Sequence, residues 1–334
     1  MNTLLSLNFR GMCMKKNKYE VTLLVASYNP KWYALKRTLC SALNQKKIMF
    51  QIVIADDGSK VNYYNEIVQL FDSYNYRDYK FIKSDVNNGT CINIYNGLLC
   101  SEGEYIKTIG PGDCLYDELT LYHWVNYAKD TCADICFGDS IFFERSHNTE
   151  NIISKRRYPQ NVSPYLKEKY LVKEGIFNYV LLNDAVWGSN FLTKYDVMLT
   201  YMEQIVGKIK YAEDMIYRMM ICDGKKMNYY PENVIWYEYG SGISTSGESK
   251  WDSIILEEKI VSNRLICENN IFKGINRIRF SFVINCLSKR NKSWIKYIMY
   301  PSLIKFKIKK DSIHANTDKD VDIDLFYKIC NEKD

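Results

Sequence analysis

The sequence predicts an α/β protein with a mixed, mostly parallel sheet that is flanked by helices and followed by a basic helical extension. Three observations carry this prediction. Short apolar runs alternate with segments of helical periodicity through the first third of the chain, which is the pattern of strand–helix units in a parallel sheet. Polar clusters follow three of these apolar runs. Basic residues concentrate in one segment near the C-terminus.

The expected elements between residues 19 and 110 follow one another in a regular order. Apolar runs that end in polar residues indicate buried strands, and apolar residues near a 3.6-residue spacing indicate helices. Pro30 suits a helix start, because its φ is fixed and its missing N–H is not needed there. The pattern predicts strands over 19–29, 50–60, 79–85 and 104–110, and helices over 31–45, 65–74 and 89–103.

Polar clusters mark the ends of three predicted strands. They read SYN (27–29), DDGS (56–59) and GPGD (110–113). Right-handed crossovers place the carboxyl ends of parallel strands at one edge of the sheet, which is where ligands bind in open α/β folds. We therefore expect the three clusters to lie together and to form part of a site.

The pattern is less regular after residue 115. The acidic start, apolar stripe and Gly stop of 211–224 predict a helix with good terminal signals. Residues 225–244 resemble a strand, a turn, a second strand and a Gly/Ser loop. The other expectations are a helix over 115–129, strands within 133–144 and a polar, loop-rich stretch over 150–170.

Composition and motifs exclude several classes of protein. The 334 residues are 47% apolar, which is enough for a sizeable core. The eleven cysteines include no C-x-x-C pair and no His cluster accompanies them, so a zinc site is not expected. No G-x-G-x-x-G turn or P-loop is present, and the three histidines are isolated.

The cellular setting is read from what the sequence lacks. The first thirty residues show no signal peptide, and no apolar run approaches the ~18 to 20 residues of a membrane span. The scattered cysteines then suit a reducing cytoplasm. We expect a cytoplasmic protein.

Residues 271–310 contain eleven Lys and Arg residues and no Asp or Glu, so the net charge of +6 arises from this segment. A solvated helical face is the usual role of such charge. The interleaved Ile, Phe, Trp and Tyr residues instead suggest binding to an anionic membrane surface. Nucleic acid is the competing electrostatic partner, and we do not expect it.

The ordered motifs of residues 19–245 resemble family 2 glycosyltransferases of the GT-A fold. The family opens with a strand into (S/T)YN, a helix that ends near S-x-x-x-Q, and a second strand into DDGS. The segments NNGTCINIYN (87–96), EYIKTIGPGD (104–113), AEDMIYR (212–218) and YEYGSGIST (237–245) are similar to later family motifs. The resemblance implies a GT-A domain over 19–245, with a nucleotide-binding half (19–114) and an acceptor half (115–245). Residues 1–18 would be a lead-in, and 246–334 a helical, basic extension.

The resemblance implies that the strand ends bind a nucleotide-sugar. A carboxylate can accept hydrogen bonds from a uracil N–H and from ribose hydroxyls. Asp57 would contact the base, Asp56 would support the turn, and Ala26–Ser27–Tyr28 with Asn29 would frame the nucleotide. Asn88, Gly89 and Asn93 would belong to the loop and helix near the donor. The alternatives are an Asp-rich turn at DDGS and a helix entry with solvated Asn residues at 88–96.

The GPGD segment occupies the family's D-x-D position, where carboxylates hold Mn²⁺ or Mg²⁺. Gly110 and Gly112 replace two of these acids, so Asp113 is the only candidate metal ligand. One carboxylate with diphosphate oxygens and water can still hold Mg²⁺, though more weakly. Gly112 can also let the backbone approach the donor closely. The alternative is a metal-free turn.

The resemblance assigns the acceptor chemistry to residues near the 211–224 helix. Asp214 would be the general base that deprotonates the acceptor hydroxyl, and Glu213 would support it. Arg218 lies four residues further along the same helical face and could pair with Asp214. Trp187, in the acceptor-side segment, could stack on a sugar or belong to the core. An acid at a helix start is also favoured by the helix dipole alone.

These expectations combine into an inverting glycosyltransferase at the inner face of a bacterial membrane. It would transfer a sugar, hexosyl or N-acetylhexosaminyl, from a UDP-sugar to a saccharide or polyprenyl-linked acceptor in surface-polysaccharide synthesis. Two alternatives stay open, because fold does not fix function. The first is an inactive GT-A module that binds nucleotide-sugars or glycans. The second is a basic nucleic-acid-binding α/β protein.

Overall fold

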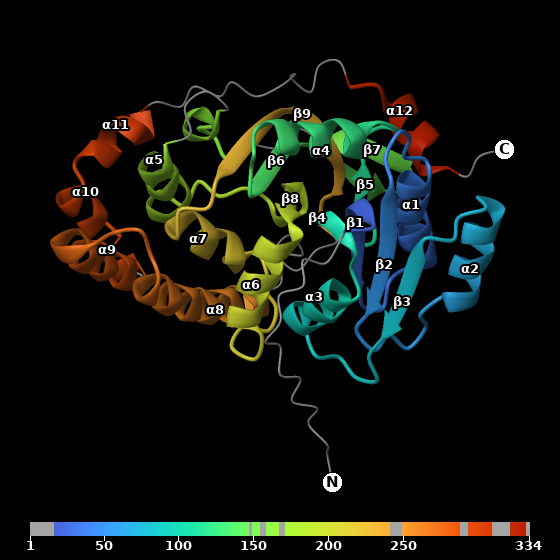
Figure 1. Ribbon diagram of the computed structural model, residues 1–334, viewed down its shortest axis with the longest axis horizontal. Helices are drawn as coiled ribbons and strands as arrows, with labels where there is room; N and C mark the ends of the chain where they lie inside the picture. The colour runs from blue at the N-terminus through green and yellow to red at the C-terminus, as the bar shows by residue number, and fades with distance from the viewer. Residues whose placement is uncertain are drawn as a thin grey trace, which may run out of the picture.

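The computed structural model describes residues 17–146, 149–153, 158–166, 171–240, 249–287, 293–308 and 321–331. The predicted lead-in and the Gly/Ser loop that follows residue 240 lie almost entirely outside these ranges. Figure 1 shows a central sheet with helices on both of its faces and a group of C-terminal helices along one edge of the molecule.

The first half of the chain folds as strand–helix units. Each buried strand has apolar residues pointing to both faces, because helices cover both sides of the sheet. The elements are β1 (Tyr19–Ser27), α1 (Trp32–Leu43), β2 (Phe50–Asp56), α2 (Tyr64–Ser73), β3 (Tyr79–Lys83), α3 (Thr90–Leu99) and β4 (Gly103–Ile109). All seven elements were predicted, and their ends differ from the prediction by a few residues.

The second half is less regular. Its strands and longer helices are β5 (Cys114–Leu115), α4 (Thr120–Asp130), β6 (Ile135–Ser146), β7 (Thr149–Ile153), α5 (Val172–Ile176), β8 (Phe191–Lys194), α6 (Tyr195–Ile205), α7 (Met215–Cys222) and β9 (Met227–Glu238). Short helical turns occupy Ser163–Tyr165, Phe177–Leu181 and Gly188–Asn190. The predicted helix over 115–129 begins later, at Thr120, because Cys114 and Leu115 pair with β9 as a short strand.

The prediction of a strand, a turn and a second strand over 225–244 is wrong, because β9 is one continuous strand. Its parallel pairing with β6 is regular up to Tyr229 and resumes at Asn233, with register shifts between. Pro231 lies in the interrupted stretch and has no N–H to give to a ladder. The proline therefore produces a local irregularity in the strand and no reversal of the chain.

The sheet is mixed, as predicted. Its order is β3-β2-β1-β4-β8-β6-β9-β5, and β7 pairs with β6. Strands β1 to β4 are parallel, whereas β8 pairs antiparallel with both β4 and β6. The carboxyl ends of β1, β2 and β4 consequently meet at one edge, as the positions of the three polar clusters require.

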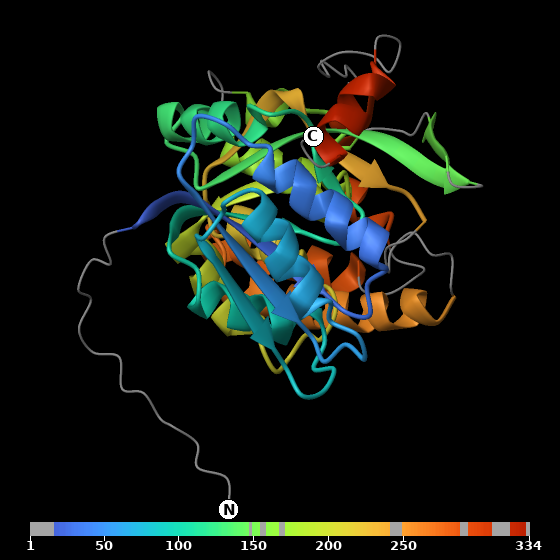
Figure 2. The same ribbon diagram turned by 90° about the vertical axis from the view of Figure 1, so that its right-hand side faces the viewer.

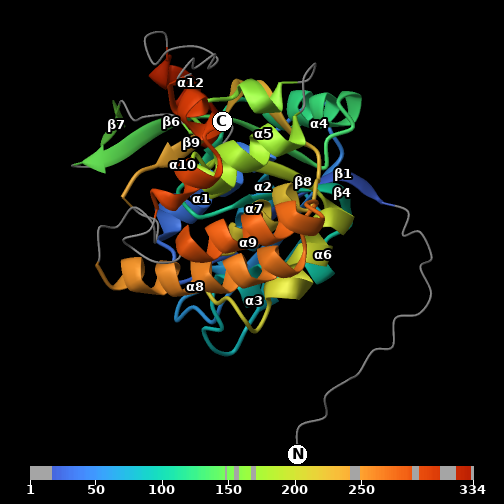
Figure 3. The ribbon, with the colours of Figure 1, turned by 90° about the vertical axis from the view of Figure 1, so that its left-hand side faces the viewer.

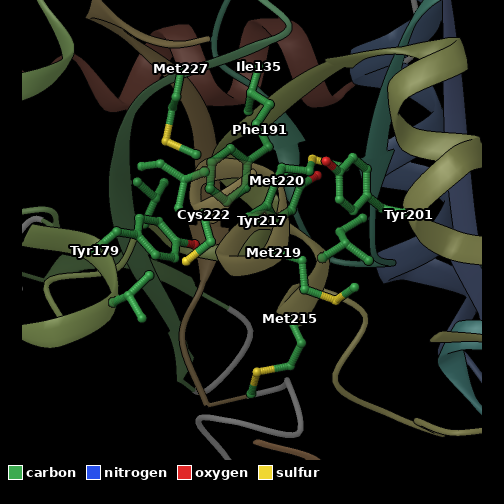
Figure 4. Close-up of a cluster of buried hydrophobic side chains, with 14 of the residues drawn as sticks. Ile135, Tyr179, Phe191, Tyr201, Met215, Tyr217, Met219, Met220, Cys222 and Met227 are labelled. Carbon is green, nitrogen blue, oxygen red and sulfur yellow. The ribbon is translucent and has the colours of Figure 1, made fainter. Parts of the chain in front are cut away.

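Two large hydrophobic clusters lie on opposite faces of the sheet. Successive residues alternate between them: Leu23 and Val25 pack with α1, α2 and α4, whereas Leu24 packs with α3, α6 and α7. Figure 4 shows part of the second cluster, where Tyr217 and Met220 of α7 lie near Phe191 and Met215 and Met219 of the same helix lie farther from it. The rings of Phe191 and Tyr217 stack with centroids 3.6 Å apart. All eight residues of α7 are buried, so the start of this helix is held firmly.

The C-terminal part is helical, as predicted. It comprises α8 (Ser249–Glu268), α9 (Gly274–Leu287), α10 (Ile295–Met299), α11 (Ser302–Ile308) and α12 (Ile323–Cys330). Helices α8 to α11 gather on one side of the molecule, which faces the viewer in Figure 3. Ile266, Phe280 and Leu303 belong to the same hydrophobic cluster as α7. The extension therefore shares a core with the domain that precedes it.

Helix α12 lies apart from α8–α11 and returns to the sheet beside α1 (Figure 2). Phe326 is 1% exposed and packs against Phe143 and Trp236. The Asn44 side-chain amide at the end of α1 donates to the carbonyl of Ile329 at 2.9 Å. Among the described residues, no helix is long and apolar enough to cross a membrane.

Candidate active site

A pocket of about 590 Å³ opens between the carboxyl ends of β1 and β4 and the start of α7. Five predicted site residues line it: Ala26, Asp113, Trp187, Glu213 and Asp214. The pocket thus joins the predicted donor edge of the sheet to the predicted acceptor side. Residues that the sequence did not single out complete the wall, among them Thr108, Tyr158, Asn183, Tyr211 and Ile255.

The two acids at the end of β2 are used to build loops. The Asp57 carboxylate accepts the backbone N–H of Asn88 at 2.9 Å and of Gly89 at 2.8 Å. Asp56 accepts the N–H of Ser59 at 2.8 Å, which is the turn-supporting role predicted for it. Both side chains are at most 3% exposed. Asp57 therefore fixes the loop that contains Asn88 and Gly89, and its contact with a base stays a prediction.

The other predicted donor residues surround these two acids. The Asn29 backbone N–H donates to the Ser59 hydroxyl at 2.7 Å, and its side chain accepts the N–H of Lys60 at 2.9 Å. Ser27 is buried, and its carbonyl accepts the N–H of Asp57. Tyr28 is 51% exposed at the end of β1. A tyrosine in that position is available to a ligand.

Asn93 is a scaffold residue. It is 4% exposed, and its side-chain amide donates to the carbonyl of Ala55 at 2.9 Å and lies 3.5 Å from that of Ser27. These contacts of the Asn93 amide hold the ends of β1 and β2 together. Asn93 contributes to the donor edge by positioning these strands, and a direct contact with the donor stays a prediction.

Gly89 brings the donor loop against the loop that precedes α7. Its φ is +93°, and a Cβ atom there would lie 2.6 Å from the carbonyl oxygen of Lys210. That same carbonyl accepts the N–H of Cys91 at 3.0 Å. Only glycine permits this backbone conformation and this approach. The loop at 87–89 is therefore in direct contact with the segment that carries Glu213 and Asp214.

The GPGD turn at the end of β4 is held from behind by α1. The Thr38 hydroxyl accepts the N–H of Gly112 at 2.9 Å, and the Arg37 guanidinium donates to the carbonyl of Gly112 at 3.0 Å. Arg37 also forms a buried ion pair with Glu238, at 2.7 Å. Gly112 has a φ of +111°, and a Cβ there would lie 2.2 Å from Oε2 of Glu238. The Glu238 carboxylate thus fills the space that a side chain at position 112 would need.

Asp113 is the one acid of the turn, and it faces the pocket. Its Oδ1 accepts the backbone N–H of Glu238 at 3.1 Å. Burial raises the pKa of Asp113 to about 7, although that hydrogen bond and the charge of Lys107 act to lower it. The carboxyl group is therefore ready to change its protonation state near neutral pH.

Lys107 is a charged residue of the site that the sequence analysis missed. It lies in β4, is fully buried, and donates to the carbonyl of Thr108. Burial lowers its pKa to about 7, and the nearby Asp113 carboxylate acts in the opposite direction. The signal for it was a lysine in the middle of a strand that was predicted to be buried, because a buried charge normally has a partner.

The side chains at the D-x-D position do not fit a divalent cation well. Mn²⁺ and Mg²⁺ prefer several oxygen ligands, whereas glycines occupy positions 110 and 112 and the Asp113 carboxylate already accepts a hydrogen bond beside a buried lysine. Within the described ranges, no group of three or more His, Cys, Asp or Glu side chains is placed to hold a metal ion. Binding of Mn²⁺ or Mg²⁺ by Asp113 stays a prediction.

Glu213 and Asp214 face the pocket from the start of α7, where Asp214 is the N-cap. Burial, with the adjacent Asp214 carboxylate, raises the pKa of Glu213 to about 8. Burial also raises the pKa of Asp214, but the positive charge of Arg218 counteracts it. Two neighbouring carboxyl groups that resist joint ionisation favour one shared proton. The charge of Arg218 favours the ionised form of Asp214, and burial favours the protonated form of Glu213.

Arg218 acts on Asp214 by its charge. Its guanidinium donates to Oδ1 of Asn263 on α8 at 2.8 Å, and no ion pair between Arg218 and Asp214 is found in the described part of the chain. The predicted close pair is therefore replaced by a buried cation one turn below the acid.

A carboxylate of the C-terminal extension fixes the loop that carries the acidic pair. Glu258 on α8 accepts three successive backbone N–H groups, those of Lys210 at 2.9 Å, Tyr211 at 3.0 Å and Ala212 at 2.7 Å. Glu258 is 7% exposed. The same helix contributes Ile255 to the pocket wall. The extension is thus a structural part of the site, which the sequence analysis did not anticipate.

Trp187 belongs to both the core and the pocket. Its ring lies against Phe142, Tyr158 and Tyr237, with centroids 5.7 to 6.1 Å apart. Among the described residues, its buried indole N–H has no hydrogen-bond acceptor. An aromatic wall that is held in this way can stack against the apolar face of a sugar ring.

Known proteins share the family and the fold. Residues 22–186 match the family described as Glycosyl transferase family 2. No curated protein matches the chain by sequence. A structure of S. aureus TarS residues 1–349 superposes with a TM-score of 0.53 at 14% identity, covering 86% of this chain and 77% of that one. The TarS complex with UDP-GlcNAc gives 0.57 at 12% identity, with coverage of 87% and 81%.

A longer TarS structure, at a TM-score of 0.53 and 13% identity, is covered over 49% of its length, so this chain spans about half of it. At these identities the superpositions establish the shared fold, and the family match establishes the relationship in sequence. Together they show that residues 22–186 form a glycosyltransferase family 2 domain and that the chain has the GT-A fold.

Proposed function

We propose that the protein is an inverting glycosyltransferase that moves a sugar from a UDP-linked donor to an acceptor hydroxyl. The observation that carries the proposal is the placement of Asp214 and Glu213 across a pocket from the strand ends that the family uses for the donor. One wall can hold the nucleotide-sugar, and the other carries Glu213 and Asp214, whose pKa values are raised by burial. Such a pair is suited to general-base catalysis.

The residues imply the following single displacement. The ionised Asp214 carboxylate accepts the proton of the acceptor hydroxyl as its oxygen attacks the anomeric carbon. The bond from that carbon to the diphosphate oxygen breaks, and the diphosphate leaves with the bonding electron pair. Attack from the face opposite the leaving group inverts the configuration. The positive charge of Arg218 acts to lower the pKa of Asp214, whereas burial raises the pKa of Glu213 to about 8.

The choice of UDP draws on the structural neighbours. TarS structures are described in complex with UDP and with UDP-GlcNAc, and this chain presents the same fold. An N-acetylhexosamine or a hexose is the proposed sugar. Ala26, Tyr28 and the loop fixed by Asp57 would receive the nucleotide, and Trp187 would lie on the acceptor side. The proposed acceptor is a saccharide or a polyprenyl-linked saccharide of a bacterial surface polysaccharide, in the cytoplasm.

The proposal is tested by screening UDP-, dTDP- and GDP-sugars for thermal stabilisation of the full chain, with Mn²⁺, with Mg²⁺ and with EDTA. We expect UDP-sugars to raise the melting temperature and to be hydrolysed or transferred, with loss of turnover in the Asp214→Asn variant. Stabilisation without any turnover would indicate the inactive binding module. No stabilisation by any donor would overturn the proposal.

A further inference from the structure

Helix α9 carries a stripe of exposed apolar side chains. Ile275 is 75% exposed, Ile278 is 67% exposed and Phe282 is 49% exposed. Their spacing of three and four residues places them on one face of the helix. The opposite face is buried through Phe280 and Ile284. The helix is therefore firmly packed, and its outer stripe is a feature of the surface.

The next two helices carry further exposed apolar side chains. Trp294 is 57% exposed at the start of α10, Ile298 on the same helix is 64% exposed, and Ile304 on α11 is 50% exposed. Helix α10 packs against both α9 and α11, and the three helices lie on one side of the molecule (Figure 3). We call these six side chains the apolar ridge: Ile275, Ile278, Phe282, Trp294, Ile298 and Ile304.

The charge around the apolar ridge indicates what binds it. Segment 271–310 has eleven basic residues and no acidic residue, and Lys273, Arg277 and Lys305 are exposed beside the ridge. A second copy of the chain would bring the same positive charge to the contact, which opposes self-association. Nucleic acid would meet the cations but would leave six large apolar side chains in water. An anionic bilayer satisfies both, since its headgroups meet the cations and its acyl region takes up the apolar residues.

We propose that α9, α10 and α11 dock on the surface of an anionic lipid bilayer, with the apolar ridge inserted at the headgroup boundary. The indole of Trp294 suits this depth, because tryptophan is enriched where one end of a side chain is apolar and the other is wet. The docking contact itself does not depend on the reaction that the pocket performs.

The docked surface adjoins the acceptor side of the pocket. Helix α8 packs against α9, contributes Ile255 to the pocket wall, and places Nζ of Lys259 2.8 Å from Oδ1 of Asn183, which also lines the pocket. Resting on the proposed function, this geometry assigns the acceptor to the lipid-linked class, because a membrane-anchored acceptor would reach the pocket from the bound bilayer.

The test is co-sedimentation of the full chain with vesicles of phosphatidylcholine alone or with added phosphatidylglycerol, at low and high salt. We expect binding to the anionic vesicles only. Changing Ile275, Ile278 and Phe282 together to Ser should weaken it by about tenfold or more. Changing Lys273 and Lys305 to Gln should weaken it less and reduce its dependence on salt. The matched control changes Met49, Val61 and Leu99 to Ser, since these are similarly exposed residues of the first half of the chain.

Several outcomes would overturn the docking proposal. The first is that the ridge variant binds anionic vesicles as well as the wild type does. The second is that the wild type binds neutral and anionic vesicles equally. The third is that the ridge variant differs from the wild type only in its oligomeric state. Preferential binding to RNA over anionic vesicles would also do so. Thermal stabilisation by UDP-sugars, measured on the same variants, reports separately on the pocket. If the protein docks on vesicles but binds no donor, the docking proposal is supported and the assignment of a lipid-linked acceptor is contradicted.

Discussion

The molecule has two pairs of neighbouring acids, one at the end of β2 and one at the start of α7, and their surroundings differ. Asp56 and Asp57 at the end of β2 are almost fully buried and accept three backbone N–H groups between them. Glu213 and Asp214 line the pocket, and burial raises the pKa of each. A carboxylate whose oxygens accept backbone N–H groups holds the surrounding loops in place. A pair that resists joint ionisation can exchange a proton with a substrate.

Replacing Asp214 by Asn should give the largest effect on activity. The variant keeps the shape of the side chain but cannot accept a proton, so we expect turnover to fall by about 10²- to 10⁴-fold. Donor binding, measured by calorimetry, should remain close to wild type. Glu203→Gln, an exposed acid on α6, is the control. Unchanged turnover in Asp214→Asn would remove the assigned base.

Replacing Glu258 by Gln tests whether the acidic pair needs its anchored loop. The amide would turn an NH₂ group toward backbone N–H groups that now share a carboxylate, so we expect a loss of about 2 kcal/mol in unfolding free energy, together with a lower kcat. The neighbouring Glu257 is exposed on the same helix turn, and Glu257→Gln should change neither quantity. Equal behaviour of the two variants in urea unfolding and turnover would contradict the anchoring role.

Asp57→Asn should lower the stability of the fold, whereas Asp214→Asn should lower only the activity. The Asn88 and Gly89 N–H groups lose one of their two acceptor oxygens, so the unfolding free energy should fall by about 1 to 2 kcal/mol. Asp214→Asn should not destabilise the fold, because it removes an unfavourable buried charge. A stable Asp57→Asn protein with the wild-type urea midpoint would break the comparison between the two acid pairs.

Gly112→Ala should cost about 1 to 2 kcal/mol, because an added Cβ at φ +111° meets the Glu238 carboxylate. At Gly110 a Cβ would meet nothing within 4 Å, so Gly110→Ala is the matched control and should leave the melting temperature nearly unchanged. Equal melting temperatures in calorimetry would show that Glu238 moves aside freely.

The acidic pair at the start of α7 should also make the stability depend on pH through Glu213. Its pKa is raised from 4.5 to about 8 in the folded protein, so the folded state binds more protons than the unfolded chain between these values. The stability of the wild type should therefore fall, relative to Glu213→Gln, as the pH rises through that window. Urea midpoints of both proteins across the window measure this difference. A constant difference would show that the carboxyl group is not perturbed.

Much of the first half of the chain could be predicted from its sequence. Strands β1 to β4 are short apolar runs bounded by polar clusters, and parallel pairing follows from the helices between them. The clusters at 27–29, 56–59 and 110–113 meet at one edge, as the topology requires. Local pattern was sufficient there because each element is covered by helices that lie next to it in sequence.

The residues that the sequence could not indicate act over long separations. Glu257 and Glu258 are adjacent and chemically identical, and only tertiary packing decides which of them turns toward the loop at 210–212. Likewise Glu238 occupies the space beside Gly112, although the two residues are 126 positions apart in the sequence. Helical periodicity indicates which face of a helix is apolar. It does not indicate which distant backbone N–H groups a buried carboxylate will accept.

The return of α12 to the sheet has a consequence for folding. The hydrogen bond from Asn44 to Ile329 joins residues 285 positions apart, so closing this contact costs chain entropy that is regained only after the rest of the domain has formed. Its amides should consequently exchange with solvent through a local opening, with less protection than those of β1 or α7. We therefore expect α12 to dock late during folding and to be among the first elements to open in the native protein.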